Sequence, residues 1–414
     1  MVQRRSRDAG RSARDDALAV LRVRNSALAL ALLPAAVAVV LFAGDAPAAL
    51  RWPPVALAAF TAAVAVATGL FIARARPAVT PTIEVPERAA PALHGLIREL
   101  ATRLDVPPPG GIALTPDCDS WLEEPPRPPG APQGRADAPG PVLVIGSPFL
   151  WWMRVDELRA LLAPVVAGTG PAAHPDIASA RRCVRAWDAA ADPARGASPL
   201  RRPLAAFAGW VARLLLRLSA PYSAEMERGV ALAAAARAQD VDARLRDAAQ
   251  EQVGLAYAGW DRLLTRVALP AWRIGRWPRG LDAGVVSALT ELSRRDRLAE
   301  GYAARLGERP ACDLLERPGA MDEEISLLAA RLFHGTPGRQ DADWTPVDWP
   351  AYPDEVVDRI WRDRAARLFA ALGAAETPTL ACALQRLTDA AAGHGTEELA
   401  ARLAADAAQA QAPA

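Results

Sequence analysis

The sequence predicts a mainly α-helical protein with a small β element, headed by a two-helix transmembrane hairpin. Two apolar runs without charged residues, 26–43 and 53–73, stand close to the N-terminus. Most of the remaining chain is alanine-rich, with apolar residues at the three- and four-residue spacing of helices. Only short segments, such as residues 142–145, have the continuous apolar character of a buried strand. Hydrophobic residues make up 51% of the chain, which is high for a wholly soluble protein.

Each apolar run is close to the roughly 20 residues that a helix needs to cross a bilayer. Pro34 lies inside the first run, where membrane helices tolerate proline. Arginine is frequent in residues 4–24 and follows the second run at 74 and 76, whereas loop 44–52 contains only one. Because positive charge stays on the cytoplasmic side, we expect a cell (inner or plasma) membrane protein with both termini and the bulk of the chain in the cytoplasm. The lipid bilayer is then its first partner. A hydrophobic hairpin buried in a soluble core is the alternative.

Charge and cysteine usage narrow the classes of function. The formal net charge is +1, so the chain lacks the basic surplus of nucleic-acid-binding proteins, and we expect no nucleic-acid partner. All basic residues are arginine, which with 37 prolines and abundant alanine indicates a high-GC bacterial genome. The four cysteines are far apart and form no CxxC pair, which argues against a zinc ribbon or a disulfide framework. Scattered, reduced cysteines favour a cytoplasmic domain.

Residues 141–170 form the centre of the predicted domain. A short buried strand at 142–145 is followed by a turn and then by a helix that begins near Val155. Acidic residues follow at once in the first turn of this helix, where carboxylates suit the positive end of the helix dipole. Upstream, residues 89–104 have the pattern of an amphipathic helix, and a proline-rich turn separates it from a strand-like segment at 112–114.

This order of elements, and the run Glu-Leu-Arg-Ala-Leu-Leu-Ala at 157–163, resemble the HtpX-type zinc metallopeptidases, the M-forty-eight peptidases that include the CAAX prenyl proteases. In that family the helix runs directly into a His-Glu-x-x-His motif. The resemblance covers about residues 89–236. It implies an HtpX-like metallopeptidase-type helical domain behind the membrane hairpin.

The chemistry of that family is missing from this chain. Pro164 stands at the first zinc ligand, Val165 at the general base and Gly168 at the second ligand. A zinc hydrolase needs two imidazoles one helical turn apart and a carboxylate that takes a proton from the metal-bound water. Proline and glycine cannot ligate through side chains, and valine cannot act as a base. We expect Pro164 to kink or end the helix, with Gly168 and its neighbours suited to a left-handed C-cap.

The third zinc ligand of the family is matched by Glu225, in the sequence Glu225-Met226-Glu227. One carboxylate cannot hold zinc by itself, so Glu225 is expected to be vestigial. His174 and Asp176 follow the central helix and look like a shifted remnant of the family's polar tail. They are candidates for a substitute metal set with Glu225, but a cap or surface turn is the favoured interpretation. We expect no cofactor, and zinc only if the chain is an active peptidase.

Two other segments have open interpretations. Residues 204–218 are apolar but contain Arg213 and Arg217, which makes a third full span improbable. Packing on the core is the favoured interpretation, and a helix on the membrane surface is the alternative. Trp344, Trp349 and Tyr352 lie among prolines and are a candidate peptide-binding patch, although such clusters more often pin a loop against a core.

The resemblance and the degenerate motif together predict a membrane-anchored pseudopeptidase that binds a peptide or membrane-protein partner without hydrolysis. A divergent active zinc metallopeptidase and a structural membrane protein without peptidase ancestry are the alternatives. The C-terminal half is expected to be helical, with helices at 281–306, 322–333, 354–372 and 377–391. The predicted organisation is an Arg-rich cytoplasmic tail (1–25), a transmembrane hairpin (26–76), a linker (77–88), the degenerate peptidase domain (89–250) and a helical C-terminal region (251–414).

Overall fold

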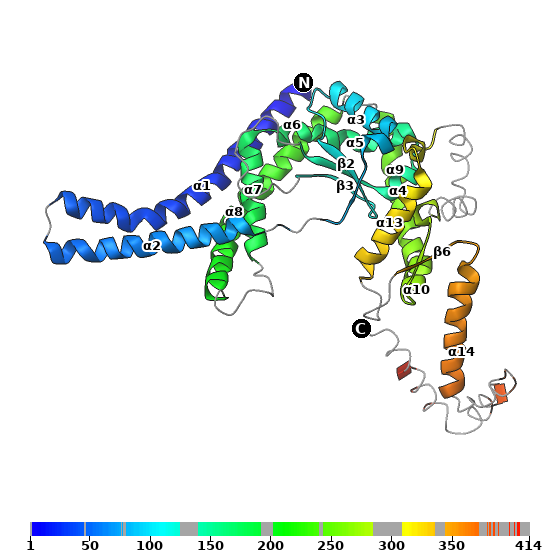
Figure 1. The fold of residues 1–414 in the computed structure, drawn as a ribbon. Helices are drawn as coiled ribbons and strands as arrows, with labels where there is room; N and C mark the ends of the chain where they lie inside the picture. Colours follow the sequence, from blue (N-terminus) through cyan, green and yellow to red (C-terminus); the bar gives the residue numbers. More distant parts are fainter. Residues whose placement is uncertain are drawn as a thin grey trace. The chain divides into compact units, whose positions relative to one another are not determined.

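The fold is described from a computed structural model of the full chain (Figure 1). It describes residues 2–371 except 45–46, 76, 78–79, 125–139, 192–201, 240–242, 285–308 and 336–343, together with isolated positions beyond 371. Most of the predicted helices at 281–306 and 377–391 lies outside the described residues. The chain divides into two compact units: unit 1 contains Met1–Val253 and Gly307–Glu316, and unit 2 contains Gly254–Leu306 and Arg317–Ala414.

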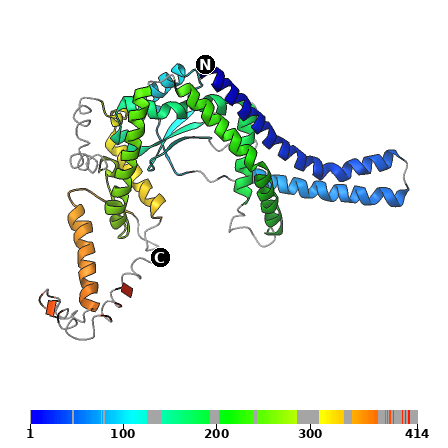
Figure 2. The same ribbon diagram turned by 180° about the vertical axis from the view of Figure 1, so that it is seen from behind.

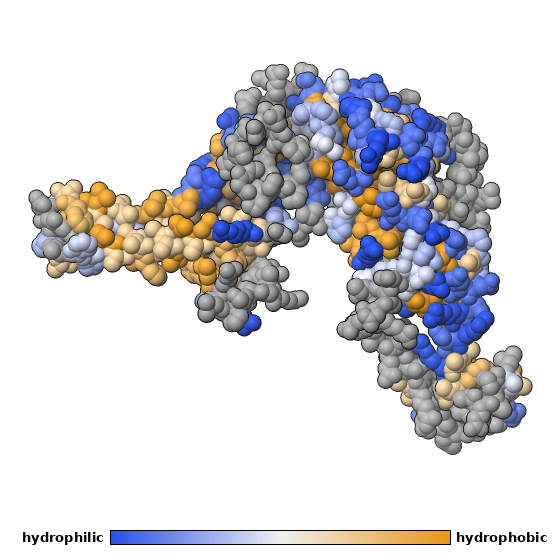
Figure 3. Space-filling view, viewed as in Figure 1, coloured by the Kyte–Doolittle hydropathy of each residue, from blue (hydrophilic) through white to orange (hydrophobic). Residues whose placement is uncertain are grey.

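The predicted N-terminal hairpin is confirmed. It consists of α1 (Val2–Ala43) and α2 (Ala48–Arg74), which pack against each other. Within them, Ser12–Ala43 and Trp52–Arg74 have mean hydropathies of 2.5 and 2.3 and are long and apolar enough to cross a membrane. Only 6% of each apolar window is buried, so the large side chains face outward, as the continuous orange surface of the hairpin shows (Figure 3). Such a surface is suited to lipid and not to water. The chain is therefore associated with a membrane.

Most of segment 1–25, for which we predict an Arg-rich cytoplasmic tail, forms the first part of α1, which begins at Val2. Ala13, Ala17 and Val20 are fully buried in a cluster with residues of α7 (Pro175–Ala191) and α8 (Arg202–Ala238). The arginine-rich composition hid this packing, because the buried face uses small residues between the charges. Both views show α1 running along α8 (Figures 1 and 2).

A four-stranded sheet forms the centre of unit 1. Its order is β1 (Ile83–Glu84), β2 (Gly111–Thr115), β4 (Val142–Gly146) and β3 (Ser120–Glu123). Strands β2 and β4 are parallel, with Ile112 opposite Leu143, and the two outer strands are antiparallel to their neighbours. Both predicted strands are thus confirmed. Strand β1 lies in the segment expected to be a linker, because pairing with β2 orders it where its own sequence gives no strand signal.

Helices cover this sheet and build the core. They are the short η1 (Glu87–Ala89), α3 (Pro91–Arg103), α4 (Ser147–Trp152), α5 (Val155–Ala167), α6 (Thr169–Ala172), α7, α8 and the first part of α9 (Ala243–Leu263). Apolar side chains from α3, β2, β4, α4 and α5 are almost completely buried, among them Leu93, Ile97, Leu114, Ile145 and Leu158. The predicted helix from Val155 is confirmed, because apolar spacing and an acidic first turn agree there.

Residues 307–316 return to unit 1 after part of unit 2 has been made. The Val155 N–H donates to the Arg309 carbonyl at 3.1 Å, and the Ala311 N–H donates to the Met153 carbonyl at 3.0 Å. The Glu316 N–H donates to the Ala89 carbonyl at 2.9 Å. This segment, with the 3₁₀ turn η4 (Ala311–Leu314), therefore fixes the start of α5 and the approach to α3.

Unit 2 is helical with a small parallel strand pair that the sequence did not predict. It contains η3 (Leu264–Ala268), α10 (Leu269–Trp272), β5 (Arg276–Pro278), α13 (Pro318–Phe333), β6 (Thr345–Val347), η5 (Pro353–Asp358) and α14 (Arg359–Ala371). Strands β5 and β6 pair in parallel. Helix α13 was predicted to begin at Asp322, but it begins at Pro318, with proline in the first turn.

Candidate functional site

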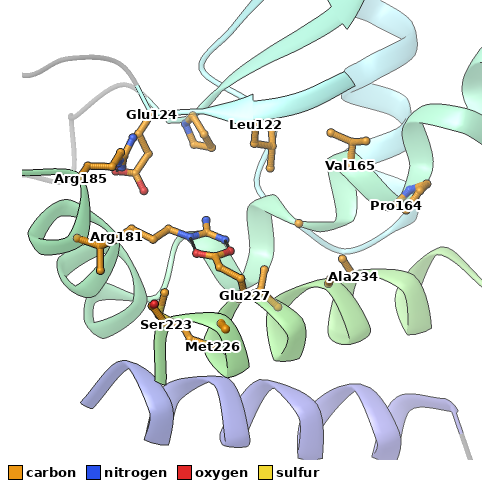
Figure 4. Close-up of a pocket in the computed structure, with 16 residues that line it drawn as sticks. Leu122, Glu124, Pro164, Val165, Arg181, Arg185, Ser223, Met226, Glu227 and Ala234 are labelled. Atoms are coloured by element: carbon orange, nitrogen blue, oxygen red, sulfur yellow. Dashed lines mark hydrogen bonds and ion pairs between the residues drawn. The ribbon is translucent and has the colours of Figure 1, made fainter. Parts of the chain in front are cut away.

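A cavity of about 580 Å³ in unit 1 lies between strand β3 and helices α5, α7 and α8 (Figure 4). Its size falls within the roughly 300–1,000 Å³ of small-molecule and cofactor pockets. Most of its surface is apolar, and two arginine–glutamate pairs supply its charge. The lining residues are Leu122, Glu124, Pro141, Pro164, Val165, Gly168, Arg181, Val184, Arg185, Ser223, Ala224, Met226, Glu227, Val230, Ala231 and Ala234.

The degenerate motif positions lie in this cavity. Pro164 and Val165 of α5, and Gly168 just after it, form one wall. Helix α8 forms the facing wall, with Ala234 lying opposite Pro164 and Val165 (Figure 4). The degenerate motif at 164–168 and the segment of α8 that contains Glu225–Glu227 therefore lie on opposite sides of one cavity.

Helix α5 is stabilised at its start and continues through its proline. The Glu157 carboxylate accepts a hydrogen bond from the Arg154 N–H at 2.9 Å, as the acidic residue of a capping box does, whereas the Arg154 side chain cannot accept the reciprocal bond. Pro164 lies inside the helix, which ends three residues later at Ala167. The C-cap residue Gly168 has a φ of −65°. The expected left-handed C-cap at Gly168 is therefore wrong, because the chain continues directly into the short helix α6.

Replacing Pro164 by alanine is expected to change the free energy of unfolding of unit 1 by less than about 1 kcal/mol. Alanine restores a hydrogen bond to the Ala160 carbonyl, worth about 1 kcal/mol net. Without proline, the unfolded chain gains conformational entropy, which lowers the free energy of unfolding by a similar amount. Chemical denaturation in detergent measures this, and Pro221→Ala, inside helix α8, is the matched control. A Pro164→Ala loss well above 1 kcal/mol, without one in Pro221→Ala, would mean that the proline is required for packing.

The two glutamates of the Glu225–Glu227 segment have different surroundings. Glu225 pairs with Arg228 one turn along α8, has a side chain that is 56% exposed, and does not line the cavity. Glu227 does line it and accepts two hydrogen bonds from Arg181, at 2.7 Å from Nε and 2.6 Å from Nη2. The sequence analysis singled out Glu225 and missed Glu227. The signal was present, since Glu227 shares a helical face with Val230, Ala231 and Ala234.

Arginines of α7 hold both acidic groups of the cavity. Arg185 pairs with Glu124, next to the end of strand β3, and Arg181 pairs with Glu227 of α8 (Figure 4). Burial disfavours the charge of Arg181, but the hydrogen bond and the charge of Glu227 outweigh it and raise the pKa of Arg181. Arg181 therefore stays charged beside Glu227. Such pairs can exchange partners with the carboxylates, amides or carbonyls of a bound chain.

The cavity does not offer the zinc ligands of the family. Pro164, Val165 and Gly168 carry no ligating group, and no group of three His, Cys, Asp or Glu side chains within the described part of the chain could hold a metal ion. The substitute set is not assembled. Asp176 accepts a hydrogen bond from Arg14 Nε at 2.9 Å, and its N–H donates to His174 Nδ1 at 3.3 Å. The first contact joins α7 to α1, and the second belongs to the turn at the start of α7.

The aromatic residues of the candidate patch belong to unit 2 and mostly serve its packing. Trp349 donates from Nε1 to the Gly280 carbonyl at 3.2 Å, and its ring lies 5.9 Å from that of Tyr352. The Tyr352 hydroxyl donates to the Val267 carbonyl at 2.8 Å, and burial raises its pKa to about 12. Trp344 instead contacts the ring of His334, at 6.0 Å between ring centroids. These contacts pin the loop around β6.

Comparison of the chain with protein-family models, with curated proteins and with solved structures finds no match. The resemblance to the HtpX-type peptidases therefore stays a prediction that rests on the residues themselves.

Proposed function

We propose that this chain is a membrane-anchored pseudopeptidase that binds an extended peptide, or an extended segment of a membrane protein, in the cavity between β3, α5 and α8. The observation that carries the proposal is the position of that cavity. Pro164, Val165 and Gly168, the positions that the resemblance assigns to the zinc ligands and the general base, line it opposite α8. The remaining lining is mostly apolar and contains two ion pairs. Such a lining can hold apolar side chains and orient a backbone without cleaving it.

Strand β3 supports an extended ligand. It lies at the edge of the sheet and pairs only with β4 among the described strands. Leu122 of this strand and Glu124 just beyond it both line the cavity, as expected for residues two apart. A peptide that adds to the β3 edge would gain main-chain hydrogen bonds, and its alternate side chains would enter the pocket.

Peptide binding is expected to fall at least tenfold in an Ala231→Trp variant. Ala231 is an exposed residue that lines the cavity, so a tryptophan there fills the cavity without disturbing the core. Ala235→Trp is the matched control, because Ala235 is exposed on the same helix but does not line the cavity. The measurement is binding of a fluorescent decapeptide library to the full-length protein in detergent, with mass spectrometry to follow peptide integrity.

Failure of the wild-type protein to bind any peptide of the library would overturn the proposal. Equal binding by Ala231→Trp and the wild type would place the ligand elsewhere. Cleavage of bound peptides that depends on added zinc would instead favour the active metallopeptidase.

We further propose that both termini lie in the cytoplasm. A cysteine placed at Ala49 within the 44–52 segment, in a variant whose native cysteines are serine, is expected to react with a membrane-impermeant maleimide added to intact cells. A cysteine placed at Ala89 is expected to react only after lysis. The basis is the excess of arginine in residues 4–24, before the first apolar run, and at Arg74. The reverse labelling pattern would reverse the orientation.

A further inference from the structure

The first half of α8 has two unlike faces. Small or modest residues pack inward, with Ala205, Ala208 and Ala212 fully or almost fully buried. The large apolar residues point outward at helical spacing and are 36–55% exposed: Leu204, Phe207, Trp210, Leu214, Leu218 and Tyr222. A soluble helix normally has the opposite arrangement. The favoured prediction of core packing at 204–218 is therefore correct for one face of the helix, which also includes Leu215, and the outward face needs another partner.

The first half of α8 packs beside the end of the hairpin at which its two apolar runs meet the arginines. Val211 and Leu216 of α8 pack against the same cluster as Ala27 of α1 and Phe71 and Ile72 of α2. Those hairpin residues lie where the apolar runs end, three residues or fewer from Arg24 and Arg74. The exposed apolar surface of the hairpin, which includes Leu28 and Leu70, therefore leads to the exposed surface of α8.

By length and composition, α8 is also long and apolar enough to cross a membrane, but it is less apolar than the two hairpin helices. Its apolar window has a mean hydropathy of 1.2, against 2.5 and 2.3 for the hairpin, and 33% of that window is buried, against 6%. One face already packs on α1 and α7, which prevents the helix from leaving the unit. Residues 202–222 contain three arginines and no acidic residue. Aromatic residues with basic neighbours are typical of a helix in the headgroup region.

We propose that the first half of α8, residues 202–222, lies on the membrane surface, with Phe207, Trp210 and Leu214 inserted among lipid headgroups and Arg213 and Arg217 facing anionic lipids. The rings of Phe207 and Trp210 are 6.0 Å apart and form one apolar ridge. Anionic lipid complements the three arginines. The continuity with the hairpin surface selects the bilayer over a second copy of the chain as the occupant.

Helix α8 continues from residues 202–222 into the wall of the pocket. The membrane contact of these residues therefore determines how far the pocket lies from the bilayer. Met226 lines the cavity eight residues after Leu218, which is about 12 Å along a helix. If residues 202–222 lie on the membrane surface, the pocket is close to the bilayer. It would then receive chain segments that emerge directly from the bilayer. This last step rests on the proposed function, whereas the membrane contact itself does not.

Fluorescence quenching in proteoliposomes tests the contact. Single cysteines replace Trp210, Leu214 or, as the control, Leu232 in full-length protein whose four native cysteines are serine. Leu232 is 59% exposed on the same helix, but beyond the proposed contact. Each carries an environment-sensitive dye, and the vesicles contain phosphatidylcholine, phosphatidylglycerol and a lipid with a nitroxide near its headgroup. Labels at 210 and 214 are expected to be quenched at least threefold more strongly than the label at 232.

Quenching at 210 and 214 no stronger than at 232 would overturn the proposal. Stronger quenching by a nitroxide at the end of the acyl chain than by one near the headgroup would mean a third span. Disulfide-linked dimers of Trp210→Cys, without quenching, would mean that a second copy covers the face. A label at Leu70, inside the second span, confirms insertion in each preparation. Peptide binding, measured separately with Ala231→Trp, can fail without affecting these results.

Discussion

Replacing Gly229 by leucine is expected to lower the free energy of unfolding of unit 1 by roughly 3 kcal/mol, the upper end of the usual cost of overpacking. A Cβ atom at Gly229 would lie 2.9 Å from Ala13 Cβ and 3.2 Å from Ala13 Cα. The atoms met are the Cβ of an alanine, which is fixed to its backbone, and that backbone itself, so no flexible side chain can move aside. The helices must separate, and the pocket wall formed by α8 moves with them. Denaturant unfolding in detergent measures the loss.

Gly95→Ala is the control for this prediction. Gly95 lies in α3, and a Cβ there meets nothing within 4 Å. Alanine is expected to stabilise the helix by about 0.5–1 kcal/mol, because glycine loses more backbone entropy on folding. If Gly229→Leu were as harmless as Gly95→Ala, α1 and α8 would not be packed as closely as described.

The second large effect is expected for Asp322→Ala in unit 2, with a loss of roughly 2–3 kcal/mol from buried donors left without acceptors. The Asp322 carboxylate is buried and accepts hydrogen bonds from the N–H groups of Asp282 and Ala283, both at 3.0 Å. It also accepts one from the Ser326 hydroxyl at 3.2 Å. Faster amide exchange at Asp282 and Ala283 would report the local loss. Unchanged exchange at both residues would contradict the prediction.

The buried Asp322 also predicts that the free energy of unfolding of unit 2 depends on pH. Burial raises its pKa above the ordinary value, although the hydrogen bonds from Ala283, Asp282 and Ser326 oppose the shift. The folded state therefore holds this proton more tightly than the unfolded state does. The stability that this proton contributes is complete below the unfolded pKa and is lost as the pH rises through the folded pKa. Asp322→Asn keeps the shape of the side chain but cannot titrate. The free energy of unfolding of this variant should therefore lack the pH-dependent part. An unchanged pH profile in Asp322→Asn would assign the dependence to another group.

The elements around α5 could be predicted from the sequence because several local signals agree there. Strand β4 is a continuous apolar run, and α5 starts with an acidic turn and keeps helical spacing as far as its proline. The hairpin could be predicted for a similar reason, since length and absence of charge suffice. In each case the local preference and the final packing favour the same conformation.

The elements that were missed depend on distant partners. Strand β1 exists because Ile83 pairs with Leu114. The acidic residue at 322 has the sequence signal of a helix start, but in the structure its carboxylate accepts hydrogen bonds from the backbone of residues 282 and 283, some 40 positions earlier. Likewise, only the packing of α7 against α8 decides that Glu227, and not Glu225, meets an arginine in the cavity. No local pattern contains these partners.

The return of residues 307–316 to unit 1 sets the order in which the protein can be completed during synthesis. The ribosome has made the hairpin, the sheet and the whole cavity by residue 253, but the partners of Val155 and Met153 are still missing. Roughly 60 further residues must follow, which takes about 3–12 s at elongation rates of about 5–20 residues per second. During that time, the start of α5 lacks its backbone hydrogen bonds to residues 309 and 311. The same helix contains Pro164. A fragment that ends at Val253 keeps this immature state permanently, so any truncation meant to isolate unit 1 has to retain Glu316.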